Sequence, residues 1–400
     1  MIRAEPIAHG CIDTSEALAL YTPNGQAIAI SWCTIEDHLM SRPHAIAFFI
    51  WRRAELTAEV FQRIREVQPK HLIVIADGPK GGDGKMAKEC EATRSVTEAV
   101  DWDCVVHRDY APLNIGLQAR IETGLDFVFE HVDRAIILED DCVPDVSFFP
   151  YCEELLERYK NDDRIACIAG DNSMNAPIPS GANYGFSRYT MIWGWATWRR
   201  AWNRHDPDLG YWPAARDSGM LERQFRSKDA SNYWTAIFNK QLEKGHNTWD
   251  YGLTLSCWKN RMVSIVPDRN MVRNTGFGEG ATHTHDPDDP RSNVAATAMT
   301  FPLVHPSTEA INTDQLDAHI ELKVFSGDKY AYGQSYEGVE FNRIRHGFGG
   351  YLDKVEPVPE VAHAYVNYML AYPNQFEDLT LLDEPSRAEA LRRLRERVSL

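Results

Sequence analysis

The sequence predicts an α/β protein in which a mostly parallel sheet is flanked by helices. Short, wholly apolar runs alternate with segments of helical periodicity between residues 44 and 156. A strand with no polar position must be buried on both faces, and helices cover both faces of parallel sheets. Polar clusters follow three of the apolar runs. Because ligands bind such sheets at the carboxyl ends of the strands, these clusters mark the expected site.

Four short runs are expected to form strands. Residues 44–50 and 71–76 are expected to be buried strands, 104–107 a short strand and 135–138 an apolar strand. Helices are expected over residues 56–67, 84–100 and 116–132, and from a start capped by Asp145. Beyond about residue 175, helical patterns dominate and tryptophans crowd together. The polar clusters at the strand ends are Trp51-Arg52-Arg53, Asp77-Gly78 and Glu139-Asp140-Asp141.

The composition argues against several classes of function. The net charge of -16 opposes nonspecific binding to nucleic-acid phosphates, which needs a basic surface. No apolar stretch reaches the roughly 18 residues that span a bilayer, and the first residues lack the apolar run of a signal peptide. The eight cysteines show no metal-binding spacing and are scattered like free buried thiols. We therefore expect a cytoplasmic protein that does not bind nucleic acid.

The acidic triplet Glu139-Asp140-Asp141 is the candidate metal site. Mg²⁺ and Mn²⁺ need only one or two protein carboxylates where phosphate oxygens and water complete the coordination. Such a cation lets an acidic strand end bind a nucleotide diphosphate and stabilises charge on the departing diphosphate. The alternative is that Asp140 and Asp141 cap the turn that follows, as Asp commonly does.

The sequence around the triplet, AIILEDDCVPDVSFF at residues 135–149, resembles the metal-binding strand of glycosyltransferases with the GT-A fold. It is most similar to the inverting N-acetylglucosaminyltransferase type. Further segments resemble one bacterial group of GT-A enzymes, often described as hemolytic-protein-like. These segments are residues 48–53 (FFIWRR), 75–79 (IADGP), 193–198 (WGWATW), 249–251 (WDY) and 274–278 (NTGFG). They occur in the order of that group and cover roughly residues 44–306.

The resemblance implies a division of the chain. A lead-in over residues 1–43 would precede a GT-A catalytic domain over 44–306. This domain would comprise a nucleotide half, 44–175, and an acceptor half, 176–306. A mostly helical extension would follow over 307–400.

The resemblance assigns the metal to Asp141, and contacts with the ribose or the donor sugar to Glu139 and Asp140. Asp77 would face the base, where a carboxylate accepts from a uracil or guanine ring N–H; plain turn formation is its alternative. One arginine of the pair at residues 52 and 53 would meet the diphosphate.

The arginine pair departs from the family, in which an Asn or Asp followed by Arg-Pro is usual. Whether Arg52 or Arg53 points inward is therefore open, and a solvated surface pair is the alternative. Asn114 and Arg120 resemble a loop-to-helix element that approaches the donor, where Gly116 would allow close backbone approach.

On the acceptor side, the resemblance implies contacts to a sugar from Trp193, Gly194, Trp195 and Trp249. Indoles pack on the apolar faces of sugars, but the alternative is that these tryptophans belong to the core. Asp250 matches the position of the base that takes a proton from the acceptor hydroxyl; its alternative is an N-cap.

His283 falls where many GT-A enzymes have a late polar residue that touches metal or diphosphate. A neutral imidazole is a good divalent ligand. The alternative is that His283 and His285 form an exposed pair in a loop.

These assignments imply a metal-dependent inverting glycosyltransferase that uses Mn²⁺ or Mg²⁺. The favoured donor is a UDP-sugar, and the acceptor is a glycan or lipid-linked molecule in cell-surface polysaccharide synthesis. The alternatives are a sugar nucleotidyltransferase, a metal-dependent hydrolase and a non-enzymatic carbohydrate-binding protein. A nucleotidyltransferase is disfavoured because no Gly-rich loop follows the first strand, and a hydrolase because the candidate metal ligands are dispersed along the chain. A carbohydrate-binding protein would explain the tryptophans but not the acids at the strand ends.

The end of the chain predicts a basic amphipathic helix. Ser386 and Glu389 have the spacing of a capping box, and four arginines follow among leucines. Such a helix would rest on an anionic membrane as a peripheral contact, or pack on the catalytic domain. Packing is the favoured interpretation, because the rest of the chain is acidic.

Overall fold

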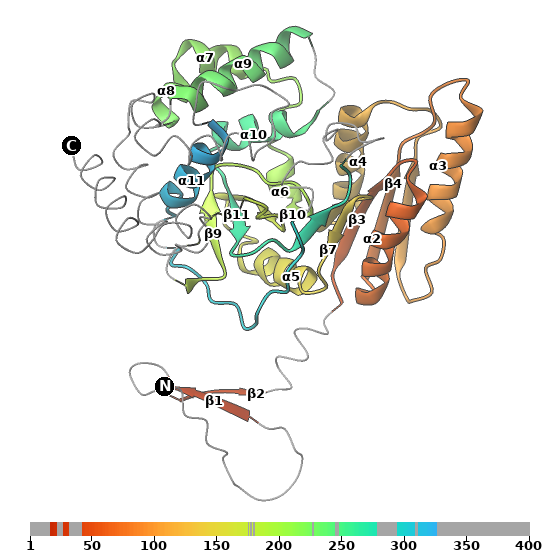
Figure 1. Cartoon of the computed structure of the whole chain (residues 1–400), viewed down its shortest axis with the longest axis horizontal. Helices are drawn as coiled ribbons and strands as arrows, with labels where there is room; N and C mark the ends of the chain where they lie inside the picture. The colour runs from red at the N-terminus through yellow and green to blue at the C-terminus, as the bar shows by residue number, and fades with distance from the viewer. Residues whose placement is uncertain are drawn as a thin grey trace, which may run out of the picture.

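The computed structural model describes residues 17–21, 27–31 and 42–325, apart from 175, 177, 179–180, 226–227, 245–247, 278–293 and 309–310. Its centre is an eight-stranded sheet (Figure 1). In spatial order the strands are β5 (Val105–Tyr110), β4 (His71–Ala76), β3 (Ala45–Ile50), β6 (Arg134–Glu139), β10 (Trp195–Trp198), β8 (Ile165–Ala169), β11 (Val263–Pro267) and β9 (Tyr184–Ser187). Only β10 and β9 run against the others within this sheet. The predicted α/β class, with a mostly parallel sheet flanked by helices, is confirmed.

Two further antiparallel pairs in the described part of the chain lie outside this sheet. β1 (Ala17–Tyr21) pairs with β2 (Ala27–Ser31) within the predicted lead-in. β7 (Cys142–Pro144) pairs with β12 (Val272–Asn274). The second pair joins the residues that follow the acidic triplet to a much later part of the chain.

Helices cover both faces of the sheet, as the wholly apolar strands require. Residues Ile46, Phe48 and Ile50 of β3 pack in the same core as α2 (Ala54–Val67) and α5 (Phe148–Arg158). The alternate residues Ala47 and Phe49 pack with α4 (Leu117–His131) and α10 (Asp250–Lys259). α3 (Gly84–Val96) lies beside α2. All six residues of β3 are buried, so neither face of this strand can carry a polar side chain cheaply.

The second half of the chain differs from the expectation that helical patterns dominate there. Strands β9, β10 and β11 all belong to the central sheet, and β10 lies in its middle. Helices do occur as well, namely α6 (Arg199–Trp202), α7 (Trp212–Asp217), α8 (Met220–Gln224), α9 (Lys228–Lys244) and α10. Their aromatic side chains form a separate core in which Trp234 contacts Trp258 with ring centroids 5.0 Å apart.

The start of α5 also differs from the prediction. The N-cap is Ser147 rather than Asp145. The Asp145 carboxylate instead accepts hydrogen bonds from the Ser147 N–H, at 2.9 Å, and from the Ser147 hydroxyl, at 2.6 Å. Asp145 therefore shapes the turn before the helix, a common use of Asp.

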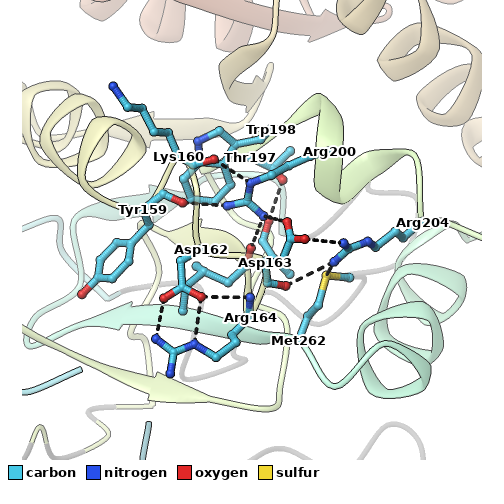
Figure 2. Close-up of polar contacts among 12 residues, drawn as sticks. Tyr159, Lys160, Asp162, Asp163, Arg164, Thr197, Trp198, Arg200, Arg204 and Met262 are labelled. Carbon is cyan, nitrogen blue, oxygen red and sulfur yellow. Dashed lines mark hydrogen bonds and ion pairs between the residues drawn. The ribbon is translucent and has the colours of Figure 1, made fainter. Parts of the chain in front are cut away.

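Arg200 fastens the far end of α5 to the start of β8 (Figure 2). Its guanidinium donates to the backbone carbonyls of Tyr159 at 2.8 Å, Lys160 at 3.0 Å and Ile165 at 2.9 Å. It also lies over the Trp198 ring, 4.3 Å from the centroid. The carbonyls of Tyr159 and Lys160 follow the last residue of α5, where carbonyls lack intrahelical partners, and the Ile165 carbonyl belongs to the first residue of β8. The contacts lie at the amino ends of β6 and β8, the edge opposite the polar clusters.

The last described helix, α11 (Asp314–Phe325), lies within the predicted C-terminal extension and packs beside β9 (Figure 1). Its Asp317 carboxylate accepts from the Ser187 hydroxyl at 2.7 Å, and from the Arg188 N–H at 3.0 Å and guanidinium at 2.7 Å. None of the described helices is long and apolar enough to cross a membrane. The predicted amphipathic helix after Ser386 lies outside the described residues.

Candidate functional site

The three polar clusters meet at one edge of the sheet, because β4, β3 and β6 are parallel neighbours. The Trp51 indole, which follows β3, donates to the Gly78 carbonyl after β4 at 2.9 Å. The backbone N–H of Trp51 donates to the carboxylate of Asp140, which follows β6, at 3.2 Å. The sequence prediction that these strand ends converge is therefore correct.

Arg53 is the arginine that points into the acidic triplet. One nitrogen of its guanidinium, Nη2, contacts Asp140 Oδ1 and also Asp141 Oδ2, the second at 2.8 Å. Arg52 turns the other way, over the Trp51 ring and toward Glu89 of α3, from which its guanidinium is 3.7 Å away. Burial works against the charge of Arg53, but the two carboxylates outweigh it and raise its pKa.

The acidic triplet holds more negative charge than Arg53 neutralises. Burial, together with the charges of Asp141 and Asp140, raises the pKa of Glu139 to about 8. Burial also raises the pKa of Asp140 to about 6, although Arg53 opposes this shift. Carboxylates close together in a buried place cannot all ionise cheaply, and an added cation would relieve that cost.

Asp250 lies within electrostatic reach of the triplet. Its charge contributes to the raised pKa of Glu139, although the two residues are far apart in the sequence. Asp250 is the first residue of α10 and accepts a hydrogen bond from the Thr248 hydroxyl. The N-cap of this helix is Trp249, so Asp250 lies in the first turn, where the helix dipole favours a negative charge.

The chain segment after β12 lies against Asp141 and fixes its position. Thr275 donates to the Asp141 carbonyl through its N–H, at 2.8 Å, and its hydroxyl, at 3.0 Å. A Cβ on Gly276 would lie 2.0 Å from Asp141 Oδ2, so only glycine leaves room for this carboxylate. Thr275 and Gly276 belong to the motif at residues 274–278, but their contacts with Asp141 were not predicted from the sequence. The missing information is the β7–β12 pairing, which joins two three-residue strands without a readable periodicity.

Asp77 uses its carboxylate within the chain. Its Oδ1 accepts from the Gly78 N–H at 2.8 Å and the Ile115 N–H at 3.1 Å, and its Oδ2 accepts from the Asn114 amide at 2.7 Å. Asp77 thus joins the turn after β4 to the loop before α4, and Asn114 serves the same link. Arg120, one turn into α4, is buried and forms an ion pair with Asp109 of β5. Contacts of these three residues with a donor remain predictions.

The tryptophans of the expected acceptor site separate into two kinds. Trp195 and Trp249 are 1% and 3% exposed and stack on each other with centroids 5.5 Å apart. Their rings belong to the core, so we correct the expectation that they stack on a sugar. Trp193 is only partly buried and meets the Phe277 ring edge-on at 5.6 Å.

Gly194 has a structural reason to be glycine. Its φ of +66° lies in the left-handed region, and a Cβ there would lie 2.7 Å from Val272 Cγ2 of β12. Its carbonyl accepts from the Gly170 N–H at 2.8 Å. The backbone between the partly buried Trp193 and the buried Trp195 therefore requires glycine at position 194.

Asp140 and Asp141 suit a cation that takes few protein ligands. Among the described residues, no group of three or more His, Cys, Asp or Glu side chains is arranged to hold a metal ion. Two carboxylate oxygens, however, converge on one cationic nitrogen of Arg53. Two such oxygens are what Mg²⁺ or Mn²⁺ uses when a diphosphate and water supply the rest. His283 lies outside the described residues, so its predicted contact is untested.

Comparison with known proteins finds likeness in structure only. No family model matches the sequence, and no curated protein matches it. The chain is similar to the mannosyltransferase PcManGT from Pyrobaculum calidifontis, solved with GDP-Man and Mn²⁺, at 12% identity and a TM-score of 0.29 over 55% of this chain and 75% of that one. It is also similar to a UDP-glucose pyrophosphorylase solved with UDP-glucose, at 8% identity and a TM-score of 0.27 over 55% and 89%. Substrate and mechanism have to be inferred from the residues of the site.

Proposed function

We propose that this protein is a metal-dependent inverting glycosyltransferase. It moves a sugar from a nucleotide-diphosphate donor, with a UDP-sugar favoured, to a glycan or lipid-linked acceptor. The observation that carries the proposal is the convergence of the Asp140 and Asp141 carboxylates at the carboxyl edge of a parallel sheet, where they meet Arg53. Asp250 is near enough for its charge to add to the raised pKa of Glu139. One separate carboxylate beside an acidic pair matches what sugar transfer needs, a base for the acceptor and a cation site for the donor.

In this proposal the donor diphosphate binds beside Asp140 and Asp141. Mn²⁺ or Mg²⁺, held by Asp141 with Asp140 nearby, would neutralise the charge that develops on the leaving diphosphate. Glu139 and Asp140 would accept hydrogen bonds from the ribose or the donor sugar. Trp193 would offer its partly exposed indole to the acceptor.

In the proposed chemical step, Asp250 acts as the general base. Its carboxylate accepts the proton of the acceptor hydroxyl while that oxygen forms a bond to the anomeric carbon of the donor. The bond from this carbon to the diphosphate oxygen breaks, and the nucleoside diphosphate leaves with the electron pair. Attack on the face opposite the leaving group inverts the configuration at the anomeric carbon.

A panel of nucleotide-sugars tests the proposal in two stages. First, UDP- and GDP-sugars are screened with Mn²⁺ for thermal stabilisation of the protein; we expect the largest shift with a UDP-sugar, and no such shift without the metal. Second, release of nucleoside diphosphate is measured with and without candidate acceptors.

The two stages separate the proposal from its alternatives. Release that depends on an acceptor, with an inverted product linkage, is the expected result. Release of nucleoside diphosphate without any acceptor other than water would indicate a hydrolase. Formation of a sugar phosphate when pyrophosphate is added to the nucleotide-sugar would indicate a nucleotidyltransferase. Binding of glycans without metal-dependent nucleotide binding would indicate a lectin. Any of these three results would contradict the proposal.

A further inference from the structure

We propose that Arg53 is an internal counter-ion that occupies the cation position between Asp140 and Asp141 and leaves it only when metal and diphosphate bind together. This inference rests on the function proposed above. It gives Arg53 a positioning role, which is to make the two binding events depend on each other.

The geometry places one positive group on both carboxylates. Arg53 Nη2 contacts Asp140 Oδ1 and Asp141 Oδ2, so the nitrogen lies between two oxygens that a metal would use. Gly276 also lies close to Asp141 Oδ2, since a Cβ on this glycine would be only 2.0 Å away. The other oxygen, Oδ1, faces the Cys142 thiol, with Sγ 3.5 Å away. Asp141 therefore has little room to meet a metal unless the Arg53 guanidinium moves.

Electrostatic repulsion makes displacement of the Arg53 guanidinium unfavourable when the metal binds without a diphosphate. A divalent cation beside the triplet would be repelled by the nearby guanidinium, and it would also have to replace a charge-assisted bond. Arg53 is only 27% exposed in its side chain, so water screens the repulsion weakly. The metal without nucleotide is therefore expected to bind poorly to the wild-type protein.

A diphosphate changes this balance because it offers Arg53 a new partner. The phosphate oxygens carry negative charge and accept hydrogen bonds from a guanidinium, often two at once. The guanidinium can then turn from the carboxylates to the diphosphate while the metal takes its former position. By linkage, the diphosphate must raise the affinity for the metal by the same factor as the metal raises the affinity for the diphosphate.

Arg52 provides a matched control for this role. It is the adjacent residue and carries the same charge, but its guanidinium lies over Trp51 and faces Glu89 rather than the triplet. An effect of overall charge would appear equally in Arg52→Gln and Arg53→Gln. An effect of the internal ion pair would appear only in Arg53→Gln.

The experiment measures Mn²⁺ affinity without nucleotide, from the spectroscopic signal of free Mn²⁺, for the wild type and three variants. Arg53→Gln should bind Mn²⁺ at least about tenfold more tightly than the wild type, a usual size for coupling between sites. Arg53→Lys, which keeps the charge, and Arg52→Gln should stay near the wild type. Equal or weaker Mn²⁺ binding by Arg53→Gln than by the wild type would overturn the proposal.

A second measurement needs only the wild-type protein, in case Arg53→Gln does not fold. Uridine diphosphate should raise the Mn²⁺ affinity of the wild type at least about tenfold. If uridine diphosphate binds yet leaves Mn²⁺ affinity unchanged, the counter-ion role is wrong while the nucleotide site stands. If no nucleotide binds at all, the proposed function is wrong, and tighter Mn²⁺ binding by Arg53→Gln would still establish the counter-ion.

Discussion

Replacing Gly276 with alanine should displace the carboxylate of Asp141, the proposed metal ligand, without disturbing the fold. The new Cβ would lie 2.0 Å from Asp141 Oδ2. The two atoms must separate by about 1 Å or more to reach even the closest contact that such atoms make. The backbone cannot supply this movement easily, because Thr275 donates twice to the Asp141 carbonyl and β12 pairs with β7 beside it.

The Asp141 side chain must therefore rotate away from its place between Arg53 and Gly276. An off-rotamer side chain costs on the order of 1 kcal/mol, which a folded domain tolerates. A misplacement of about 1 Å in a reacting site, in contrast, costs roughly a hundredfold in rate. We expect Gly276→Ala to lose about that factor in kcat/KM and most of the Mn²⁺-dependent gain in nucleotide affinity.

The matched control is Gly84→Ala. A Cβ on Gly84, the first residue of α3, would meet nothing within 4 Å, so this variant adds the same methyl group without a clash. Calorimetric titration of uridine diphosphate, with and without Mn²⁺, compares both variants with the wild type. Wild-type metal dependence in Gly276→Ala would refute the idea that Gly276 fixes Asp141.

Three further variants test other parts of the structure. Asp250→Asn should keep donor affinity while turnover falls by about 10²- to 10⁴-fold, as measured by steady-state kinetics; early melting with unchanged specific activity would instead support a role in starting α10. Arg200→Met should lower the free energy of unfolding by about 2 kcal/mol in denaturant titration, because three carbonyls lose a donor. It should leave nucleotide affinity unchanged, and a change would contradict the separation of the two sheet edges. His107→Gln should reduce the loss of stability on acidification. Burial and His131 lower the pKa of His107 in the folded protein, so the unfolded chain binds a proton at this histidine at a higher pH than the folded protein does. The free energy of unfolding of the wild type therefore falls as the pH drops below about 6.5. Equal pH profiles of unfolding for variant and wild type would contradict that assignment.

Three strands in the first half of the sheet, β3, β4 and β6, were predictable because nearly all their residues are buried and apolar. β5 is different, because it is not buried and runs three residues beyond the predicted segment. The segment at residues 71–76 was predicted with both ends correct, and the strands that became β3 and β6 within a residue at each end. Complete burial leaves no polar position to confuse the pattern. Since the strands are parallel neighbours, the meeting of their polar ends followed from topology alone.

The second half was not predictable by the same means. β10, with the sequence WATW, is too short and too aromatic to distinguish a strand from a buried helix. Its place between β6 and β8 depends on pairings across long stretches of chain. The same holds for Trp195, because an indole in a core and an indole in a sugar site look alike in sequence.

Within the site, the sequence indicated the residue types and the structure determined their directions. Arg52 and Arg53 are identical side chains one residue apart, so only side-chain geometry decides that Arg53 meets the acids. Gly276 matters because it leaves room for the Asp141 carboxylate, and no sequence pattern connects these two residues. For Asp77 the sequence left two roles open, a contact with the base and formation of the turn. Its hydrogen bonds show the role in the turn.

The binding of uridine diphosphate to the wild type and to Asp141→Asn, titrated by calorimetry with and without Mn²⁺, tests the proposed metal-dependent nucleotide site most directly. The substitution keeps the size of the side chain and removes its charge. We expect Mn²⁺ to strengthen nucleotide binding at least about tenfold in the wild type and to have no such effect in Asp141→Asn, which should melt as the wild type does. An equal gain from Mn²⁺ in both proteins would show that Asp141 does not hold the metal.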